Sequence, residues 1–196
     1  MVLGNVRFDM KFDDIQSKQW RGVILASAPQ LIDPNFRETI IYLAESEEKG
    51  ALGFILNRPV GKHLRDIVRG RSDVDEALLD VPVFFGGPVH SENLFLVLFQ
   101  PGQADDEISC RIDAPVEQLE AHIQNETGWV RACLGYSGWG EGQLKQEIDS
   151  GAWIIQKPHL VLLNENPGPA LWSAFVTNDQ RWRSLVPYLP SDPNLN

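Results

Sequence analysis

Ser137 is the side chain that comes nearest to a known catalytic motif. It lies in Gly135-Tyr136-Ser137-Gly138-Trp139, one position away from the Gly-x-Ser-x-Gly pattern of a nucleophile elbow. That elbow needs glycine two residues after the serine, where the turn is tightest, and this chain has Trp139 there. We therefore expect the segment to form a turn between a strand and a helix, without a serine nucleophile.

Metal and thiol chemistry have little support in the sequence. The histidines are far apart in the chain, and Cys110 and Cys133 do not form a Cys-x-x-Cys pair. His90-Ser91-Glu92 has the His-x-Glu start of a zinc deaminase, but the cysteine pair that completes that motif is missing. The sequence therefore predicts no metal site and no cofactor.

Two stretches suggest anion binding. Residues 135–142 contain four glycines and lead into a helix, whose first free N–H groups favour anions. The stretch lacks the Gly-Lys-Ser/Thr ending of a P-loop, and Glu141 would compete with a bound anion. The segment from Arg58 to Arg71 holds five basic residues and one acidic residue. We interpret it as a solvated helix face paired with nearby acids such as Asp75, and a local anion or nucleic-acid contact is the alternative.

The charge balance bears on partners and location. A net charge of −10 repels nucleic acid and anionic membranes at long range, so direct nucleic-acid binding is not expected. The acidic runs, including Glu45 to Glu48, are typical of solvated loops and not of paired catalytic carboxylates. No apolar run is long enough to span a membrane. We expect a cytoplasmic protein in which both cysteines are reduced and buried.

Hydrophobic periodicity predicts the elements and the fold class. Short apolar runs predict strands at residues 23–28, 39–43, 51–56, 81–85, 94–99, 108–112, 129–136 and 153–163. Amphipathic spacing predicts helices at residues 64–68, 116–123 and 144–148, and Asp113 is expected to cap the second of them. Further helices are expected after Pro169, and Trp182 and Leu185 also fit a helical pattern there. Because strands and helices do not alternate strictly, we expect an α+β fold with a mixed, largely antiparallel sheet and flanking amphipathic helices.

We expect one domain over residues 19–189. Residues 1–18 would form an N-terminal extension, and residues 190–196, which are polar and contain proline, would form a flexible tail.

Four segments of the chain together resemble a known family. They are residues 28–37, 50–59, 85–89 and 135–144. In this order and spacing they resemble the AlgH/YqgE family of bacterial proteins, from Trp20 to Leu189. The resemblance implies a compact α+β domain and a link to transcriptional regulation, because one branch is named for a proposed role in regulating alginate synthesis. It implies no reaction, and relatives often carry a small residue such as Ala where this chain has Ser137.

Polar residues and glycines that end the strands form a candidate binding surface. Three segments each follow an apolar strand, and we expect them to frame one shared cleft on one side of the sheet. The alternative is that they lie at different ends of the sheet and serve only the architecture. The candidate residues are Asn57, Arg58, Gly86, Gly87, Tyr136, Trp139 and Gln143.

The sequence favours binding over catalysis. We expect a non-catalytic regulatory or binding protein that contacts a protein or a small ligand. The alternative is an enzyme of unknown class that acts on a small anionic ligand at the strand-end loops, and direct DNA binding is a third hypothesis. If the shared cleft forms, Arg58→Ala would weaken binding and leave the thermal stability nearly unchanged.

Overall fold

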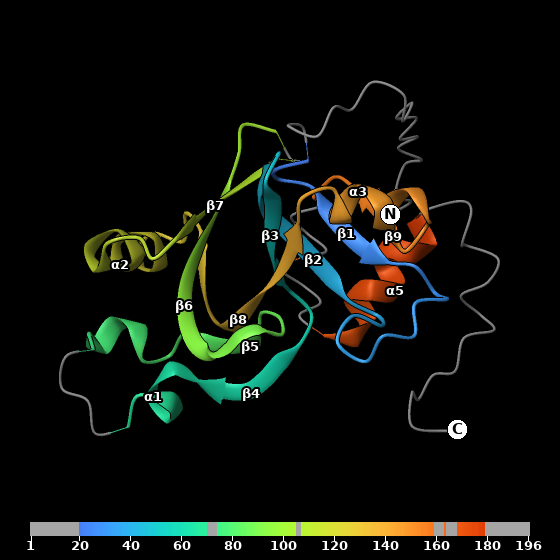
Figure 1. The fold of residues 1–196 in the computed structure, drawn as a ribbon. Coiled ribbons are helices and arrows are strands. Elements are labelled where there is room, and N and C mark those ends of the chain that lie inside the picture. Colours follow the sequence, from blue (N-terminus) through green and yellow to red (C-terminus); the bar gives the residue numbers. More distant parts are fainter. Residues whose placement is uncertain (1–19, 70–73, 105–106, 159–162, 164–167, 179–196) are drawn as a thin grey trace.

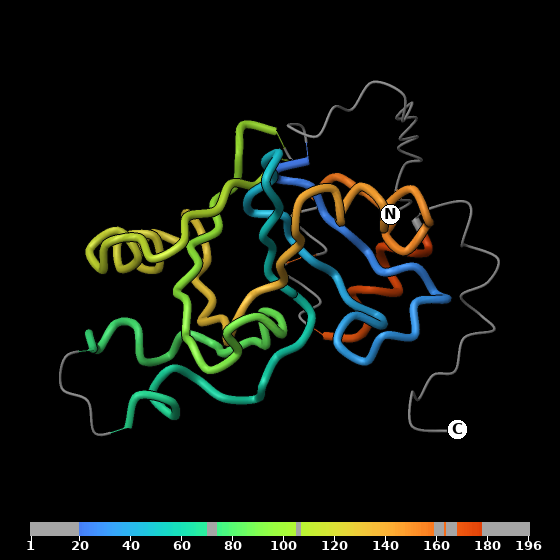
Figure 2. Tube along the Cα trace, viewed as in Figure 1, coloured from blue at the N-terminus to red at the C-terminus, as the bar shows by residue number. Residues whose placement is uncertain are grey.

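The computed structural model describes residues 20–69, 74–104, 107–158, 163 and 168–178 (Figure 1; Figure 2). The strands are β1 (Ile24–Ser27), β2 (Ile40–Glu47), β3 (Gly50–Ile55), β4 (Pro59–His63), β5 (Pro82–Phe85), β6 (Val89–Pro101), β7 (Ile108–Ile112), β8 (Trp129–Gly140) and β9 (Trp153–Gln156). The helices are α1 (Leu64–Ile67), the 3-10 turn η3 (Glu76–Leu78), α2 (Val116–Gln124), α3 (Gln143–Asp149) and α5 (Pro169–Asn178).

The strands form one curled sheet in the order β4-β5-β8-β3-β2-β1-β9, with β6 pairing with both β8 and β7. All of these pairings are antiparallel except that of β5 with β8. The long strand β8 joins the two parts of the sheet, because its first half pairs with β5 and β6 and its last residues pair with β3. In Figure 1, α3 and α5 lie on the side of β1 and β9, and α2 lies beyond β6. The predicted α+β fold with a mixed, largely antiparallel sheet is confirmed.

Both faces of the central strands are buried. On β2, Ile40 and Tyr42 face a hydrophobic cluster that includes α5, whereas Ile41 and Leu43 face a cluster that includes α3. A third cluster packs α1 and α2 against β5, β6 and β8. Burial on both faces explains why these strands read as continuous apolar runs in the sequence.

The structure contains a strand, β4, that the sequence did not predict. Pro59, which follows the end of β3, begins β4 and pairs with Phe84 of β5. All five residues of β4 are exposed, so this strand lacks the apolar pattern by which strands are recognised in a sequence. A proline fits there because β4 is at the edge of the sheet, where a missing N–H costs no ladder bond.

Two other local expectations are also wrong. Strand β8 continues through Ser137 to Gly140, where a turn was expected. Asp113 does not cap α2, because the N-cap residue of that helix is Pro115. The carboxylate of Asp113 instead accepts the N–H of Leu96 at 3.3 Å. The described residues do not include Trp182, Leu185 or the two terminal segments. They also leave out most of the strand that was expected beyond residue 156.

Candidate functional site

Arg58, which follows β3, fastens the loop that connects β1 to β2. Its guanidinium donates to the carbonyls of Asn35 at 2.8 Å, Arg37 at 2.9 Å and Pro34 at 3.3 Å. Burial, and then the neighbouring Arg37, lower the pKa of Arg58. The donors of Arg58 are therefore occupied by main-chain acceptors of the protein itself.

Asn57 supports the same loop from the inside. It is buried, its side-chain oxygen accepts the N–H of Ile40 at 2.9 Å, and its side-chain amide donates to the carbonyl of Glu38 at 2.8 Å. Glu38 has a φ of 53°, a strained value for a residue other than glycine, and this bond helps to hold it there. Asn57 is thus part of the scaffold.

Arg58→Ala is expected to lower the free energy of unfolding by about 1–2 kcal/mol, because several carbonyl groups lose a charged donor. This differs from the sequence-based expectation of unchanged stability. Arg58→Lys should not restore the loss, since one ammonium group does not reproduce the planar fork of the guanidinium. Amide hydrogen exchange should accelerate in residues 33–39. Arg69→Ala, which removes only a surface pair, is the control, and equal effects of the two substitutions would contradict the role assigned to Arg58.

Gly86 and Gly87 let two stretches of backbone lie against each other. The N–H of Gly86 donates to the carbonyl of Leu134 at 2.8 Å. A Cβ on Gly86 would lie 2.3 Å from the carbonyl oxygen of Gly135, and one on Gly87 would lie 2.2 Å from the carbonyl carbon of Tyr136. Both distances are much shorter than a van der Waals contact, so these glycines have an architectural role.

Trp139 and Gln143 fasten α3 to the sheet. Trp139 is only 6% exposed, and its indole N–H donates to the carboxylate of Glu147 at 2.8 Å. Gln143 donates to the other oxygen of that carboxylate and accepts the N–H of Gly140. The polar groups of both side chains are therefore engaged within the protein.

The seven candidate residues do not frame one cleft. Gly50 pairs with Gly140, so the turn before Gln143 lies beside the start of β3. Asn57 lies beyond the end of β3, about 20 Å away at the rise of an extended strand. The glycine loop after β5 is at the Asn57 end, because the N–H of Ile55 at the end of β3 donates to the carbonyl of Gly86. The candidates are thus spread along β3: Gln143 lies near its start and Asn57 beyond its end, whereas Tyr136 lies between them, next to Gly87.

An open cleft of about 410 Å³ lies over β2, β3, β8 and the start of β6, and we call it the Tyr136 cleft. Register places one set of alternating side chains on this face: Glu45 is opposite Leu52, which is opposite Gly138. Tyr136 is two residues before Gly138 and therefore on the same face, next to its pairing partner Val89. Of the seven candidates, Tyr136 and Trp139 line the cleft.

Gly138 differs from the other glycines of the motif. A Cβ at this position would meet only side-chain atoms, the nearest being the ring edge of Tyr136 at 3.2 Å and a methyl group of Val89 at 3.5 Å. The φ angle of Gly138 is not in the positive range that favours glycine, so its backbone conformation is open to other residues. The missing side chain of Gly138 therefore leaves room at the floor of the Tyr136 cleft.

Two lining residues of the Tyr136 cleft were missed by sequence reasoning. Glu45 and Glu47 were expected in a solvated loop, but they belong to β2 and lie two residues apart on the cleft face. The signal that could have placed them is their i, i+2 spacing directly after the apolar run of residues 40–44, which is the spacing of one face of a strand.

The nucleophilic side chains are turned away from the cleft or buried. Ser137 is fully buried, and its hydroxyl donates to the carbonyl of Gly86 at 3.3 Å. Both cysteines are free; burial raises the pKa of Cys133 to about 12 and that of Cys110 to about 11. Cys110 is only partly buried, which corrects the expectation that both thiols are enclosed. In the part of the chain that the structure describes, no cluster of three or more His, Cys, Asp or Glu side chains could hold a metal ion.

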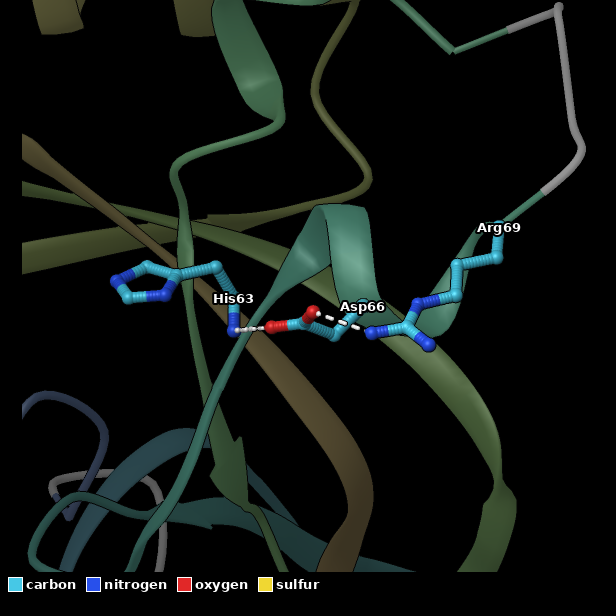
Figure 3. A network of polar contacts seen from close by, with 3 residues as sticks. All are labelled: His63, Asp66 and Arg69. Carbon is cyan, nitrogen blue, oxygen red and sulfur yellow. Dashed lines mark hydrogen bonds and ion pairs between the residues drawn. The ribbon is translucent and has the colours of Figure 1, made fainter.

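Two arginines of the basic segment that contains α1, Arg65 and Arg69, pair with carboxylates, although neither partner is Asp75. Asp66 accepts the backbone N–H of His63 and a guanidinium N–H of Arg69, and Figure 3 shows this network. The backbone hydrogen bond and then the Arg69 contact lower the pKa of Asp66. Arg65 pairs with Asp80, an acid that the sequence did not single out. These contacts offset part of the positive charge of the segment.

A buried arginine is a second charged feature that the sequence did not reveal. Arg131 is 5% exposed, and its guanidinium donates to the carbonyl of Leu56 at 2.7 Å and lies 4.4 Å from the ring centroid of Phe84. Burial lowers its pKa to about 10. Arg131 therefore braces the end of β3 from within the core.

No helix among the described residues is long and apolar enough to cross a membrane.

Comparisons with known proteins agree with the fold and motifs. A family model described as AlgH-like matches residues 24–181. A UPF0301 protein of Streptomyces avermitilis is 32% identical over 190 residues, covering 89% of this chain and 94% of the relative. Another, from Burkholderia cenocepacia, is 39% identical over 142 residues, covering 66% of this chain and 72% of the relative. The solution structure of the AlgH protein from Pseudomonas aeruginosa has a TM-score of 0.62 at 26% identity, covering 91% of this chain and 99% of that one.

The chain therefore belongs to the AlgH-like family.

Proposed function

We propose that this protein is a non-catalytic binding protein and that the Tyr136 cleft is its ligand site. The observation that carries the proposal is the cleft itself, whose volume of about 410 Å³ is in the range of small-molecule sites. Its lining combines an aromatic ring, aliphatic side chains and two carboxylates, which are groups that recognise a ligand by shape and charge. A protein that binds its ligand unchanged also fits the regulatory role that the family resemblance implies.

The alternative expectation, an enzyme for a small anionic ligand at the strand-end loops, has less support. Arg58 and Asn57 are occupied by the loop that they fasten. The charged residues that line the Tyr136 cleft are both glutamates, which disfavour an anion.

Gly138→Leu tests the proposal, because the new side chain would fill the floor of the cleft beside the ring of Tyr136. A fragment library is screened by ligand-observed NMR against the full chain, and hits at the cleft should lose their signal in Gly138→Leu. Ala121→Leu adds the same side chain to the exposed face of α2 and should keep the hits. Gly138→Ala is a smaller variant in case the leucine disturbs folding, and it should weaken the same hits. Hits that bind all variants equally, or a screen without hits, would contradict the proposal.

A further inference from the structure

The two charged side chains that line the Tyr136 cleft, Glu45 and Glu47, have the same sign. Glu45 and Glu47 project from β2 on the cleft face and are both exposed, and none of the described residues that line the cleft is basic. Among the described residues, no side chain makes a hydrogen bond or an ion pair with either carboxylate. Two carboxylates that remain solvated beside an apolar surface are available to a cation that enters from solvent.

The surroundings of the two glutamates differ. Besides burial, two charges act on the pKa of the Cys110 thiol: Arg21 lowers it and Glu45 raises it, so Glu45 lies within electrostatic range of that thiol. Glu47 lies two residues further along β2, where it pairs with Gly50 of β3. Because Glu47 is exposed on the cleft face, we expect it to contribute to the attraction of a positive group.

The aromatic wall of the cleft is fixed in place. Phe95 packs edge-on against Tyr136, with ring centroids 5.9 Å apart at 84°. On the Val89 side, the ring of His90 lies 6.0 Å from Tyr136, and its Nδ1 is 3.4 Å from the carboxylate of Glu92. Glu92 is thus a third carboxylate close to this wall.

We infer that the Tyr136 cleft selects an ammonium or guanidinium group carried on a short aliphatic stem, an inference that rests on the function proposed above. The positive group would lie at the rim between Glu45 and Glu47, where a guanidinium can donate to carboxylate oxygens. The stem would lie over Leu52 and Gly138, with the ring of Tyr136 beside it. An aromatic ring next to such a cation adds a favourable electrostatic contact.

The net charge of the chain acts in the same direction. With a net charge of −10, the protein attracts cations and repels anions at long range. The two glutamates of the cleft attract cations as well, so the net charge and the local charges favour the same kind of ligand. Such agreement predicts binding that weakens with added salt, because solvent-exposed charges are screened over a Debye length of about 10 Å at 0.1 M salt.

The test compares two probes of the same shape and different charge, n-butylguanidinium and n-butylurea, by chemical-shift titration of the full chain at low salt. We expect the guanidinium to bind at least about five-fold more tightly than the urea. Glu47→Gln should weaken the guanidinium about three-fold or more and leave the urea unchanged. Glu117→Gln removes the same charge from the exposed face of α2 and should have little effect, which separates the local carboxylate from the net charge.

A second pair of probes distinguishes a free ligand from a polypeptide side chain. Acetyl-Ala-Arg-Ala-amide is compared with the same peptide containing citrulline, the urea analogue of arginine. Preference for arginine together with tighter binding than n-butylguanidinium supports a polypeptide source, and preference with weaker binding supports a free amine or guanidine.

The outcomes separate this inference from the proposed function. Equal binding of guanidinium and urea, with both lost in Gly138→Leu, would overturn the inference and retain the cleft as a ligand site. Binding of guanidinium that survives Gly138→Leu would overturn both. A titration in which neither probe shifts the resonances of the cleft would overturn the inference.

Discussion

Gly87→Ala is expected to lower the free energy of unfolding by about 4 kcal/mol or more, which is a large part of the stability of an ordinary domain. The new Cβ would lie 2.2 Å from the carbonyl carbon of Tyr136 and 2.4 Å from the nitrogen of Ser137. Both atoms belong to the backbone of β8, so no rotamer change relieves the overlap. The strand must move, and with it the pairing that joins the two parts of the sheet.

The control is Gly140→Ala on the same strand. A Cβ there would meet only the side-chain oxygen of Gln143 at 3.9 Å, and the φ of Gly140 is not in the left-handed region. We expect this variant to be within about 1 kcal/mol of the parent protein, since alanine mainly restricts the unfolded chain. Urea unfolding followed by circular dichroism measures both. A difference between the two variants of less than about 1 kcal/mol would contradict the close backbone packing at Gly87.

The sequence predicted those elements whose burial is visible as a local pattern. Strands β1 to β3 are apolar on both faces, and α2 shows an amphipathic stripe that leads to the buried Leu119. Strand β4 was not predicted because all of its residues are exposed and give no apolar pattern. The strand forms through its pairing with β5. Such pairing joins segments that are distant in the sequence, so the pattern of one short segment cannot reveal it.

The candidate site was less predictable than the fold for the same reason. Glycines and polar residues at strand ends mark places where the backbone is special, but they do not tell whether a ligand or another strand approaches. At Gly87 the neighbour is the backbone of β8, whereas at Gly138 it is an open cleft. The register of β8 against β3 and β6 determines which glycine faces backbone and which faces the cleft. This register cannot be predicted from the sequence pattern alone.

The tryptophans illustrate how similar motif residues acquire different roles. Trp139 was a candidate for the binding surface, but its indole donates to Glu147, and Trp153 donates to the same carboxylate oxygen at 2.7 Å. The two indoles meet edge-on, with ring centroids 5.9 Å apart. Phe36, from the loop that Arg58 fastens, packs edge-on against Trp153 at 5.7 Å. One carboxylate therefore connects α3, the sheet and this loop.

Glu147→Ala is expected to lower the free energy of unfolding by about 3 kcal/mol. Trp139 and Trp153 are 6% and 4% exposed, so both indole N–H groups would lose their acceptor where water has little access. A buried donor without a partner costs about 1–3 kcal/mol, and the two costs add in part. Glu147→Gln keeps one acceptor oxygen and should lose only about 1 kcal/mol. Urea unfolding followed by circular dichroism measures these values without relying on tryptophan fluorescence.

Asp149→Ala is the matched control for Glu147→Ala, because it removes a carboxylate of the same helix whose partner, Lys145, is on the surface. It should change the unfolding free energy by less than about 1 kcal/mol. A double-mutant cycle of Glu147→Ala with Trp139→Phe should give a coupling of at least about 1 kcal/mol, since the second change removes one of the donors that the first leaves unpaired. If the two changes are additive, or if Glu147→Ala is no more costly than Asp149→Ala, then the carboxylate is solvated in the folded protein and α3 is held by its apolar contacts alone.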